Sequence, residues 1–272
     1  MSALYDRRVA LEVTAGGVGR RWEGLDVAFS VEQTAGSDPN KGEFMVYNLS
    51  EDSRRLISDS GATVRLYAGY PSTVALLFAG DIDEASSDRE GANVVTRIVA
   101  SDGGVAIRRQ VVSVARSGDT PTTTVVDDIL GALGLARGSV AALPGALKQG
   151  LSTVTRAADL LDEVCASQDH RWSVQDGAVQ IHPVGKGTPA PIIVLGPSSG
   201  LVGIPKRQVD RGAGDGATRR GVIARSLLQP GLRPGRRIRL VSEWVAGDFV
   251  VEKVKHAGSV FGPDFYSEIE AY

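Results

Sequence analysis

The sequence predicts a mainly β protein in which two strand-rich regions flank a small module that contains helices. Three observations support this fold class. Apolar and polar residues alternate at period two near both ends of the chain, as in strands with one buried face. Two segments in the middle carry apolar residues at helical spacing instead. Glycine is frequent, with 33 in 272 residues, and lies mostly between the alternating runs, where turns are expected.

Residues 1–105 are predicted to form the first β domain. Its strands are expected at Arg8–Thr14, Leu25–Val31, Glu43–Asn48, Thr63–Ala68, Leu76–Ile82 and Val94–Val99. Turn residues such as Gly16-Gly17 and Glu90-Gly91 separate them. A short helix is expected over Ser50–Ser58, because Ser50 can accept from free N–H groups at a helix start and acidic residues follow it in the first turn.

Residues 106–190 are predicted to form an α/β insert module. A helix is expected to start at Asp119-Thr120-Pro121, since proline favours the first helical position, and apolar residues follow at helical spacing. A second helix is expected from about Thr155. A hairpin is expected after it, because Asp176-Gly177 lies between two alternating runs and Asp-Gly is a strong hairpin signal.

Residues 191–272 are predicted to form the second β domain. Its strands are expected at Ile192–Leu195, Gly221–Leu227, Arg237–Val241, Asp248–Lys255 and Tyr266–Glu270. The segment Asp210–Arg220 is rich in glycine and arginine, and we expect it to be a loop. The layout of strands, helices and strands therefore predicts two β domains around an α/β module.

The bulk composition is that of a soluble globular protein. Hydrophobic residues make up 42% and charged residues 23%, and the net charge of −2 gives no global attraction to nucleic acid or an anionic membrane. No run approaches the roughly 20 apolar residues of a membrane helix, and no secretory signal is expected at the N-terminus. Because Cys165 is the single cysteine, no internal disulfide can form, which favours assembly in a reducing cytoplasm.

The sequence offers no set of catalytic, cofactor-binding or metal-ligating residues. His170, His182 and His256 are far apart, and none has a second ligand at metal-site spacing. We expect His170 and His182 to be ordinary surface or half-buried residues beside the predicted hairpin. Cys165 lies on the apolar stripe of a predicted helix, where a cysteine acts as a small hydrophobic residue rather than a nucleophile.

The acidic pairs are a further possible source of chemistry, as an acid–base dyad. Asp127 and Asp128 are neighbours on a predicted helix, so their side chains diverge by about 100°. Asp81 and Asp83 are expected to share a solvent-facing side of a strand. The glycines of residues 211–216 lack the strand, helix and Gly-Lys-Ser/Thr of a phosphate loop. The sequence therefore predicts a protein that is not an enzyme.

Basic residues gather late in the chain. They are Arg219, Arg220, Arg225, Arg233, Arg236, Arg237 and Arg239. Such a group can be a patch that faces acidic protein or nucleic acid, or it can be a solvated strand face. Few aromatic residues are interleaved, so a single-strand nucleic-acid groove is not expected. A solvated face or a protein–protein contact remains the favoured interpretation.

Three groups of segments carry a resemblance to a known family. They are Pro39–Ser50 with Val64–Tyr70; Leu77–Ile82; and the C-terminal set Gly200–Pro205, Gly221–Pro230, Pro234-Gly235, Val254–Gly258, Phe261-Gly262 and Phe265–Ala271. In order and spacing they resemble the central baseplate hub proteins of contractile-tailed phages and related injection systems. The resemblance spans most of the chain and is weakest from about residue 104 to residue 191. It departs at Ala257-Gly258-Ser259, where Gly-Asp is typical after the histidine.

The resemblance implies two tail-tube-like β-barrel domains and a homotrimeric ring with pseudo-sixfold symmetry. Such a hub is a virion structural protein of the tail baseplate. It joins the hexameric tail tube, or a tail-tip ring, to the trimeric central spike, and it meets the tape-measure protein and other baseplate proteins. No membrane contact, cofactor or specific nucleic-acid site is implied, although the genome passes the lumen. The segments Gly36–Lys41, Ser50–Ser58 and Arg211–Arg220 are expected contacts with neighbours.

Two alternatives remain open. The chain could be another tube-like tail component, such as a distal tail protein, which typically makes a true sixfold ring. It could also be a tail-associated cell-wall hydrolase, which would need an acid, nucleophile or metal set that the sequence does not offer. A spike protein is disfavoured because the chain lacks the iterated repeats of a β-helix.

Overall fold

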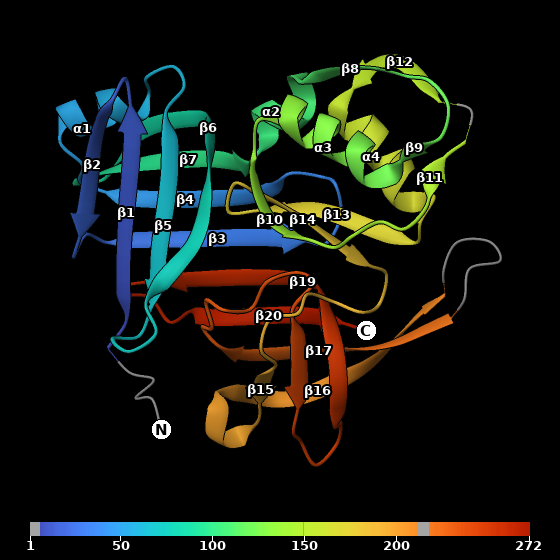
Figure 1. The fold of residues 1–272 in the computed structure, drawn as a ribbon. Coiled ribbons are helices and arrows are strands. Elements are labelled where there is room, and N and C mark those ends of the chain that lie inside the picture. The colour runs from blue at the N-terminus through green and yellow to red at the C-terminus, as the bar shows by residue number, and fades with distance from the viewer. Residues whose placement is uncertain (1–5, 149, 212–217) are drawn as a thin grey trace.

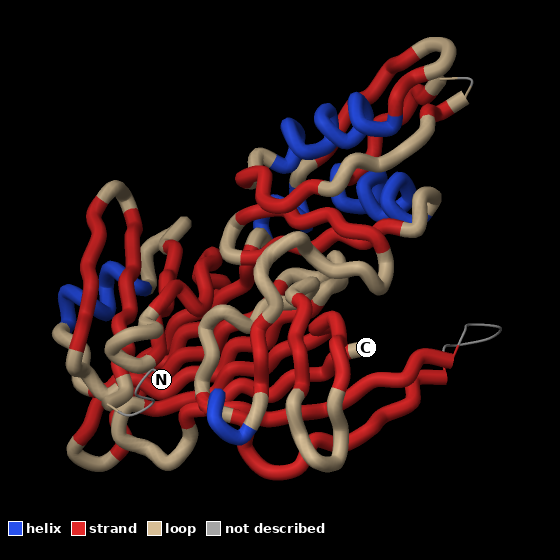
Figure 2. The backbone as a smooth tube through the Cα atoms, turned by 60° about the horizontal axis from the view of Figure 1, so that its bottom comes forward, coloured by secondary structure: helices blue, strands red, loops and turns tan. Residues whose placement is uncertain are grey.

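The computed structural model describes residues 6–148, 150–211 and 218–272. One large sheet of 13 strands forms the body of the molecule, and a helix-containing lobe stands against one side of it (Figures 1 and 2). The prediction of a mainly β chain with an α/β insert is confirmed. No helix among the described residues is both long and apolar enough to cross a membrane.

The N-terminal lobe, residues 8–102, contributes seven strands and one helix. They are β1 (Arg8–Ala15), β2 (Val18–Glu23), β3 (Val27–Thr34), β4 (Asn40–Tyr47), α1 (Glu51–Ile57), β5 (Thr63–Gly69), β6 (Ala75–Glu90) and β7 (Asn93–Asp102). Burial alternates along β3 from Val27 to Thr34, as the period-two pattern predicts. The predicted helix is confirmed as α1. Its N-cap is Ser50, as predicted, and the Ser50 hydroxyl accepts a hydrogen bond of 3.3 Å from the N–H of Ser53.

The insert, residues 104–183, folds around three helices. Its elements are α2 (Gly104–Arg109), β8 (Val111–Arg116), β9 (Thr120–Pro121), α3 (Thr122–Leu133), β10 (Ala136–Val140), β11 (Ala146–Leu147), β12 (Leu151–Arg156), α4 (Ala157–Ala166), β13 (His170–Gln175) and β14 (Ala178–Pro183). The two predicted helices are confirmed as α3 and α4. The predicted hairpin is confirmed as β13–β14, with Asp176 and Gly177 at φ of 55° and 80°, which suits a tight two-residue turn.

The C-terminal lobe, residues 193–271, completes the large sheet. It holds β15 (Ile193–Leu195), a short 3-10 helix (Pro197–Ser199), β16 (Leu201–Arg211), β17 (Thr218–Leu227), β18 (Arg237–Leu240), β19 (Gly247–Ser259) and β20 (Phe265–Ala271). The predicted loop over Asp210–Arg220 is wrong at both ends, where β16 and β17 continue as a hairpin that projects from the body (Figure 2). Cross-strand pairs of opposite charge, such as Asp210 opposite Arg219, suit this extension. The residues between, 212–217, lie outside the described residues.

The two β lobes are hydrogen-bonded into one sheet. Its strand order is β16-β17-β20-β19-β3-β4-β7-β6-β5-β1-β2, so β19 of the C-terminal lobe pairs antiparallel with β3 of the N-terminal lobe. This order is an open path, and no pairing between described residues closes either end into a barrel. The expected barrels are therefore not confirmed.

Three hydrophobic clusters lie in the described part of the chain. One belongs to the N-terminal lobe, one to the insert and one to the C-terminal lobe. The first cluster also contains Leu228 and Phe265 from the C-terminal lobe. The Phe265 ring makes edge contacts with Phe29, at 6.0 Å between centroids, and with Tyr70, at 5.5 Å. The two β lobes are thus packed together through Phe265, while the exact domain boundaries after residues 105 and 190 stay predictions.

Candidate assembly surfaces and the junction between the lobes

A buried carboxylate forms the centre of the junction between the large sheet and the insert. Asp102, at the end of β7, is fully buried and accepts hydrogen bonds from the main-chain N–H groups of Asp176, at 2.5 Å, and Gly177, at 2.8 Å. Burial raises the pKa of Asp102 to about 7, although these two hydrogen bonds act in the opposite direction. The turn of the β13–β14 hairpin is therefore held by a single side chain of the N-terminal lobe.

Further polar contacts secure the same hairpin. The side-chain amide of Asn40 donates to the carbonyl of Val174 at 2.6 Å, and Gln175 donates to the carbonyl of Thr34 at 2.9 Å. From the C-terminal lobe, Arg233 donates to the Asp176 carboxylate at 3.1 Å. Removal of a hydrogen-bond partner from a buried polar group destabilises the folded protein. These contacts therefore hold the insert against both β lobes.

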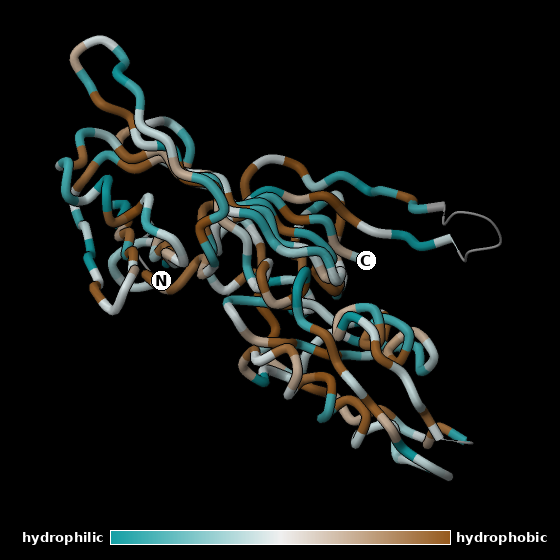
Figure 3. The backbone as a smooth tube through the Cα atoms, turned by 90° about the horizontal axis from the view of Figure 1, so that it is seen from above, coloured by the Kyte–Doolittle hydropathy of each residue, from teal (hydrophilic) through white to brown (hydrophobic). Residues whose placement is uncertain are grey.

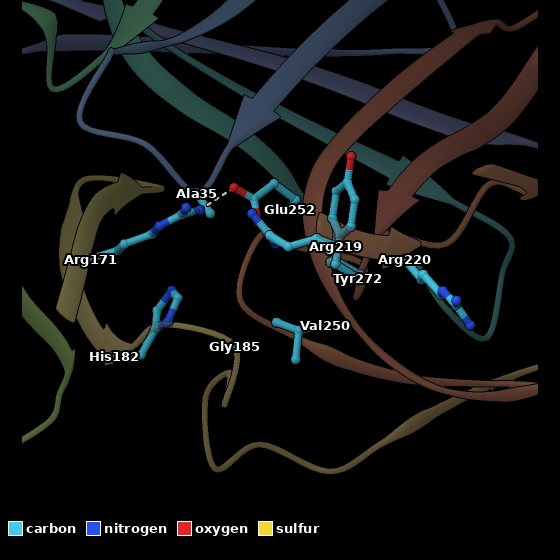
Figure 4. Close-up of a pocket in the computed structure, with 10 residues that line it drawn as sticks. Ala35, Arg171, His182, Gly185, Arg219, Arg220, Val250, Glu252 and Tyr272 are labelled. Carbon is cyan, nitrogen blue, oxygen red and sulfur yellow. Dashed lines mark hydrogen bonds and ion pairs between the residues drawn. The ribbon is translucent and has the colours of Figure 1, made fainter. Parts of the chain in front are cut away.

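An arginine–glutamate cluster lies nearby, at the edge of a cavity of about 240 Å³ (Figure 4). Glu252 of β19 forms ion pairs with Arg171 of the insert and with Arg219 of β17, the latter at 2.8 Å. Burial would raise the pKa of Glu252, but the hydrogen bonds and charges of the two arginines lower it. Arg219 also stacks over the ring of Tyr272 at 4.2 Å. The cluster ties the insert to the C-terminal lobe.

The histidines are more buried than expected. His170 and His182 have exposed fractions of 9% and 5%, so their placement as surface or half-buried residues is wrong. The reason is that their hairpin is covered on both sides, by α4 and by the C-terminal lobe. His256 is fully buried between the Ser267 hydroxyl, at 2.8 Å, and the Leu232 carbonyl, at 3.3 Å. Burial lowers the pKa of His256 to about 3, so the ring is neutral.

Cys165 is 1% exposed, and burial raises the pKa of its thiol to about 12. A thiol with such a pKa stays protonated at neutral pH, which agrees with the prediction that Cys165 is a core residue. Within residues 6–148, 150–211 and 218–272, no three His, Cys, Asp or Glu side chains gather closely enough to hold a metal ion. That the protein uses no metal, cofactor or catalytic residue stays a prediction.

The acidic pairs are separated by the structure. Asp127 pairs with Arg137 at 2.5 Å, and Asp128 pairs with Arg116 at 2.7 Å. Asp81 and Asp83 were expected to share one face of a regular strand. A β-bulge between Ile82 and Glu84 interrupts the alternation of faces at this point. These carboxylates therefore do not form a convergent pair, and Asp83 lies 2.9 Å from Arg108 instead.

The late arginines are dispersed rather than gathered in one patch. Arg219 joins the cluster at Glu252, and Arg233 and Arg236 line a cleft beside the insert. On the sheet, Arg225 lies 3.9 Å over the ring of Tyr266, and Arg239 pairs with Asp248 at 2.7 Å. Arg219, Arg233 and Arg236 are partly buried, whereas Arg220, Arg225, Arg237 and Arg239 are exposed, so the group that is compact in the sequence is divided between the junction and the surface.

The expected contact segments have different surroundings. Gly36 and Ser37 of the first segment border a hollow that α4 and β13 also line, so this loop lies against the insert. Helix α1 lies at the outer side of the N-terminal lobe and exposes Glu51, Asp52 and Arg55 (Figure 1). Of the third segment, only the strand ends at 211 and 218–220 are described.

The two end strands of the sheet, β16 and β2, offer open edges for assembly. Strand β16 exposes Ile204 by 64% and Val209 by 57%, and β2 exposes Val18 by 55%. The arm of β16 and β17 carries both apolar and polar residues and projects from the body of the molecule (Figure 3). An unpaired strand edge can bind a strand of another chain through main-chain hydrogen bonds. The sequence signal for both edges was weak because neither strand is buried on one face.

Comparison with solved structures identifies the fold. The chain matches the 43 kDa tail protein of prophage MuSo2 from Shewanella oneidensis with a TM-score of 0.69, at 8% identity over 96% of each chain. It matches the tail protein from Neisseria meningitidis MC58 with a TM-score of 0.68, at 8% identity over 97% of this chain and 96% of that one. The chain has the fold of these phage tail proteins. The resemblance to hub proteins is confirmed at this level.

A third match has a TM-score of 0.65 at 11% identity, over 95% of this chain and 76% of that chain. It is the E. coli c3393 protein, a component of the type VI secretion system with structural similarity to the T4 bacteriophage tail proteins gp27 and gp5. No protein-family model matches the chain, and no curated protein matches its sequence. The fold is thus shared at only 8–11% sequence identity.

Proposed function

We propose that this protein is the structural hub of a phage tail baseplate. In this role it forms a trimeric, pseudo-sixfold ring that joins the hexameric tail tube to the trimeric central spike. The observation that carries the proposal is the match to phage tail proteins over nearly the whole of both chains. The sequence segments that resemble baseplate hubs give separate support, because that resemblance lies in the order and spacing of residues and not in the fold.

The arrangement of the sheet suits a ring. Three chains with two β lobes each supply six β units, which can meet a sixfold tube while the chain count stays threefold. The free edges belong to different lobes, β2 to the N-terminal lobe and β16 to the C-terminal lobe. A head-to-tail contact between unlike edges generates a closed ring when the rotation between copies is suitable.

The proposed partners are a tail tube or tail-tip ring protein, the central spike, the tape-measure protein and other baseplate proteins. The proposed location is the virion, at the tail baseplate, after assembly in the host cytoplasm. The related component of the type VI secretion system supports an injection machine as the wider setting.

The oligomeric state tests this proposal directly. Native mass spectrometry of the purified protein should give a particle of three chains of 28.6 kDa each. A hexamer would instead favour a distal tail protein and would contradict the hub as proposed. Electron microscopy of the same sample should show a ring with threefold symmetry and six similar lobes.

Edge variants test how the ring is held. Val209→Lys places a charge on the β16 edge, and we expect it to shift the trimer toward folded monomers, since an edge lysine opposes strand pairing. Val154→Lys is the matched control, because Val154 is 72% exposed on β12 of the insert. The control should remain trimeric. Equal effects of the two variants would argue against pairing through β16.

We also propose that the protein is not an enzyme. The ion pairs of Asp127 and Asp128 with arginines hold these carboxylates apart, and the Cys165 thiol is buried and protonated. A cell-wall degradation assay with purified protein and isolated peptidoglycan separates this proposal from a hydrolase. Release of soluble fragments above the level of a buffer blank would overturn it.

A further inference from the structure

A cleft of about 410 Å³ lies between the insert and the C-terminal lobe. Its walls come from four places in the chain, one of which is Ser139 of β10. Asp176 belongs to the turn of the β13–β14 hairpin, Thr188 and Pro189 belong to the segment that leads to β15, and Arg233 and Arg236 precede β18. The cleft is separate from the Glu252 cluster and from both free strand edges.

Unsatisfied polar atoms gather at this cleft. The buried atoms that lack a hydrogen-bond partner among the described residues number eight, and three of them belong to residues that line it. They are Oδ1 of Asp176, Oγ1 of Thr188 and Nε of Arg236. Thr188 is only 8% exposed. Since nearly all buried polar groups in folded proteins are paired, such a group of unpaired atoms indicates that something else completes them.

The chemistry of the three atoms restricts what can bind. A carboxylate oxygen of Asp176 can only accept, Nε of Arg236 can only donate, and the Thr188 hydroxyl can do both. A simple anion would leave Asp176 without a donor, and a simple cation would leave Arg236 without an acceptor. A group that carries both an N–H donor and a C=O acceptor can satisfy both, and a secondary amide is such a group.

The surroundings favour a peptide amide. Arg233 already donates to the main-chain carbonyls of Pro230 at 2.7 Å and Leu76 at 2.6 Å, and Arg236 donates to that of Pro191 at 3.0 Å. Both guanidinium groups at this cleft thus bind main-chain carbonyls of this chain, which are acceptors of the kind that a peptide segment also offers. Pro189 and Pro234 add apolar wall without adding further N–H donors.

We propose that this cleft binds a short peptide segment of another protein, with one of its amide groups held by Asp176, Thr188 and Arg236. The bond between Arg236 and Pro191 is exposed to solvent, so rotation of the Arg236 side chain admits the segment to atoms that are otherwise covered. The site would add a specific contact with a partner that does not depend on the strand edges, and it stands whether or not the ring is trimeric.

N-methylacetamide, which contains a single peptide group, is the probe for this proposal. It is titrated into the ¹⁵N-labelled full chain, and the amide signals of Thr188 and Gly235 are followed by NMR. Sodium acetate, methylammonium chloride and ethylene glycol are titrated in parallel as an anion, a cation and a hydroxyl compound. We expect saturable shifts with N-methylacetamide that are confined to the cleft, and no saturation with the other three.

Thr188→Val removes the hydroxyl and keeps the shape of the side chain. It should weaken binding by about fivefold, which corresponds to about 1 kcal/mol for one hydrogen bond. Thr123→Val is the control, because Thr123 is exposed on α3. If Thr188→Val does not fold, Arg236→Lys makes the same test, since lysine keeps the charge but has no Nε donor in that position.

The outcomes are decisive in both directions. Saturable binding of the amide that Thr188→Val or Arg236→Lys weakens, and Thr123→Val does not, supports a peptide site. Three results overturn it: no saturable shift at the cleft, equal binding of acetate or ethylene glycol, or equal affinity in the cleft variants and the control. The first of these would mean that water alone completes the three atoms.

Discussion

Replacement of Phe265 by alanine should destabilise the N-terminal lobe, although Phe265 belongs to the last strand of the chain. The ring is 1% exposed and lies within the hydrophobic cluster of β1–β7, against Phe29 and Tyr70. Loss of a buried phenylalanine ring costs about 3–5 kcal/mol, through lost burial and the cavity that remains. Loss of the two edge-to-face contacts falls within that range.

The loss of unfolding free energy is measured by urea unfolding followed by circular dichroism. Hydrogen exchange with mass spectrometry shows which strands are destabilised. We expect faster exchange in β3 and β5 of the N-terminal lobe as well as in β20. Phe261→Ala is the matched control. Phe261 is 74% exposed four residues earlier, so its loss should change the free energy of unfolding by no more than about 0.5 kcal/mol.

Two results would refute this reasoning. A loss in unfolding free energy of less than about 1 kcal/mol for Phe265→Ala would show that the ring is not part of a close-packed core. Faster exchange restricted to β16–β20, with β3 and β5 unchanged, would show that the two β lobes unfold independently. Either result would show that the two β lobes are not stabilised by each other, although they share one continuous sheet.

Three further predictions concern single positions. A Cβ at Gly258 would lie 2.6 Å from the Phe29 ring, so Gly258→Ala should cost about 1–3 kcal/mol in urea unfolding, whereas Gly131→Ala in α3, with open space around it, should gain about 0.5–1 kcal/mol. Burial raises the pKa of Asp102 from 3.8 to about 7 in the folded state. Between these two values the folded protein binds a proton that the unfolded chain has lost, so the unfolding free energy falls as the pH rises from about 4 to 7. Asp102→Asn should therefore flatten the fall of unfolding free energy between pH 4 and 7, which reaches about 1.4 kcal/mol per pH unit for one group; an unchanged slope would contradict the assignment. Cys165 should not react with a thiol reagent such as DTNB at pH 8 until the protein is unfolded in urea, and rapid reaction of the native protein would disprove its burial.

The period-two pattern predicted the strands that have one buried face. In β3 and β4, buried positions alternate with less buried ones, and apolar residues such as Phe29, Val31 and Phe44 stand at buried sites. The buried sites at the ends of these strands carry the polar residues Gln33 and Asn40 instead. The same rule missed β2 and β16. Strand β2 has no fully buried residue, and β16 exposes Ile204 and Val209, so neither strand needs an alternation of apolar and polar residues.

The junction could not be predicted from local sequence. Asp102 and Gly177 are 75 residues apart, and Arg233 and Asp176 are 57 apart. The Asp-Gly turn was recognised as a hairpin signal, but nothing in its neighbourhood shows that a distant carboxylate binds its N–H groups. Similarly, the late arginines look like one basic group in the sequence, yet their acceptors, such as Leu76 and Glu252, come from other elements.

The pairing of β3 with β19 determines how the two lobes respond to load. It runs from Lys253 opposite Thr34 to Ser259 opposite Ala28, so main-chain hydrogen bonds cross between the lobes along the whole of this register. Within it, His256 is fully buried and Gly258 leaves room for the rings of Phe29 and Phe265. To move one lobe against the other, the molecule would have to break these hydrogen bonds together and expose a close-packed aromatic contact. In the proposed ring between tube and spike, force applied to one lobe would therefore pass to the other without a hinge between them.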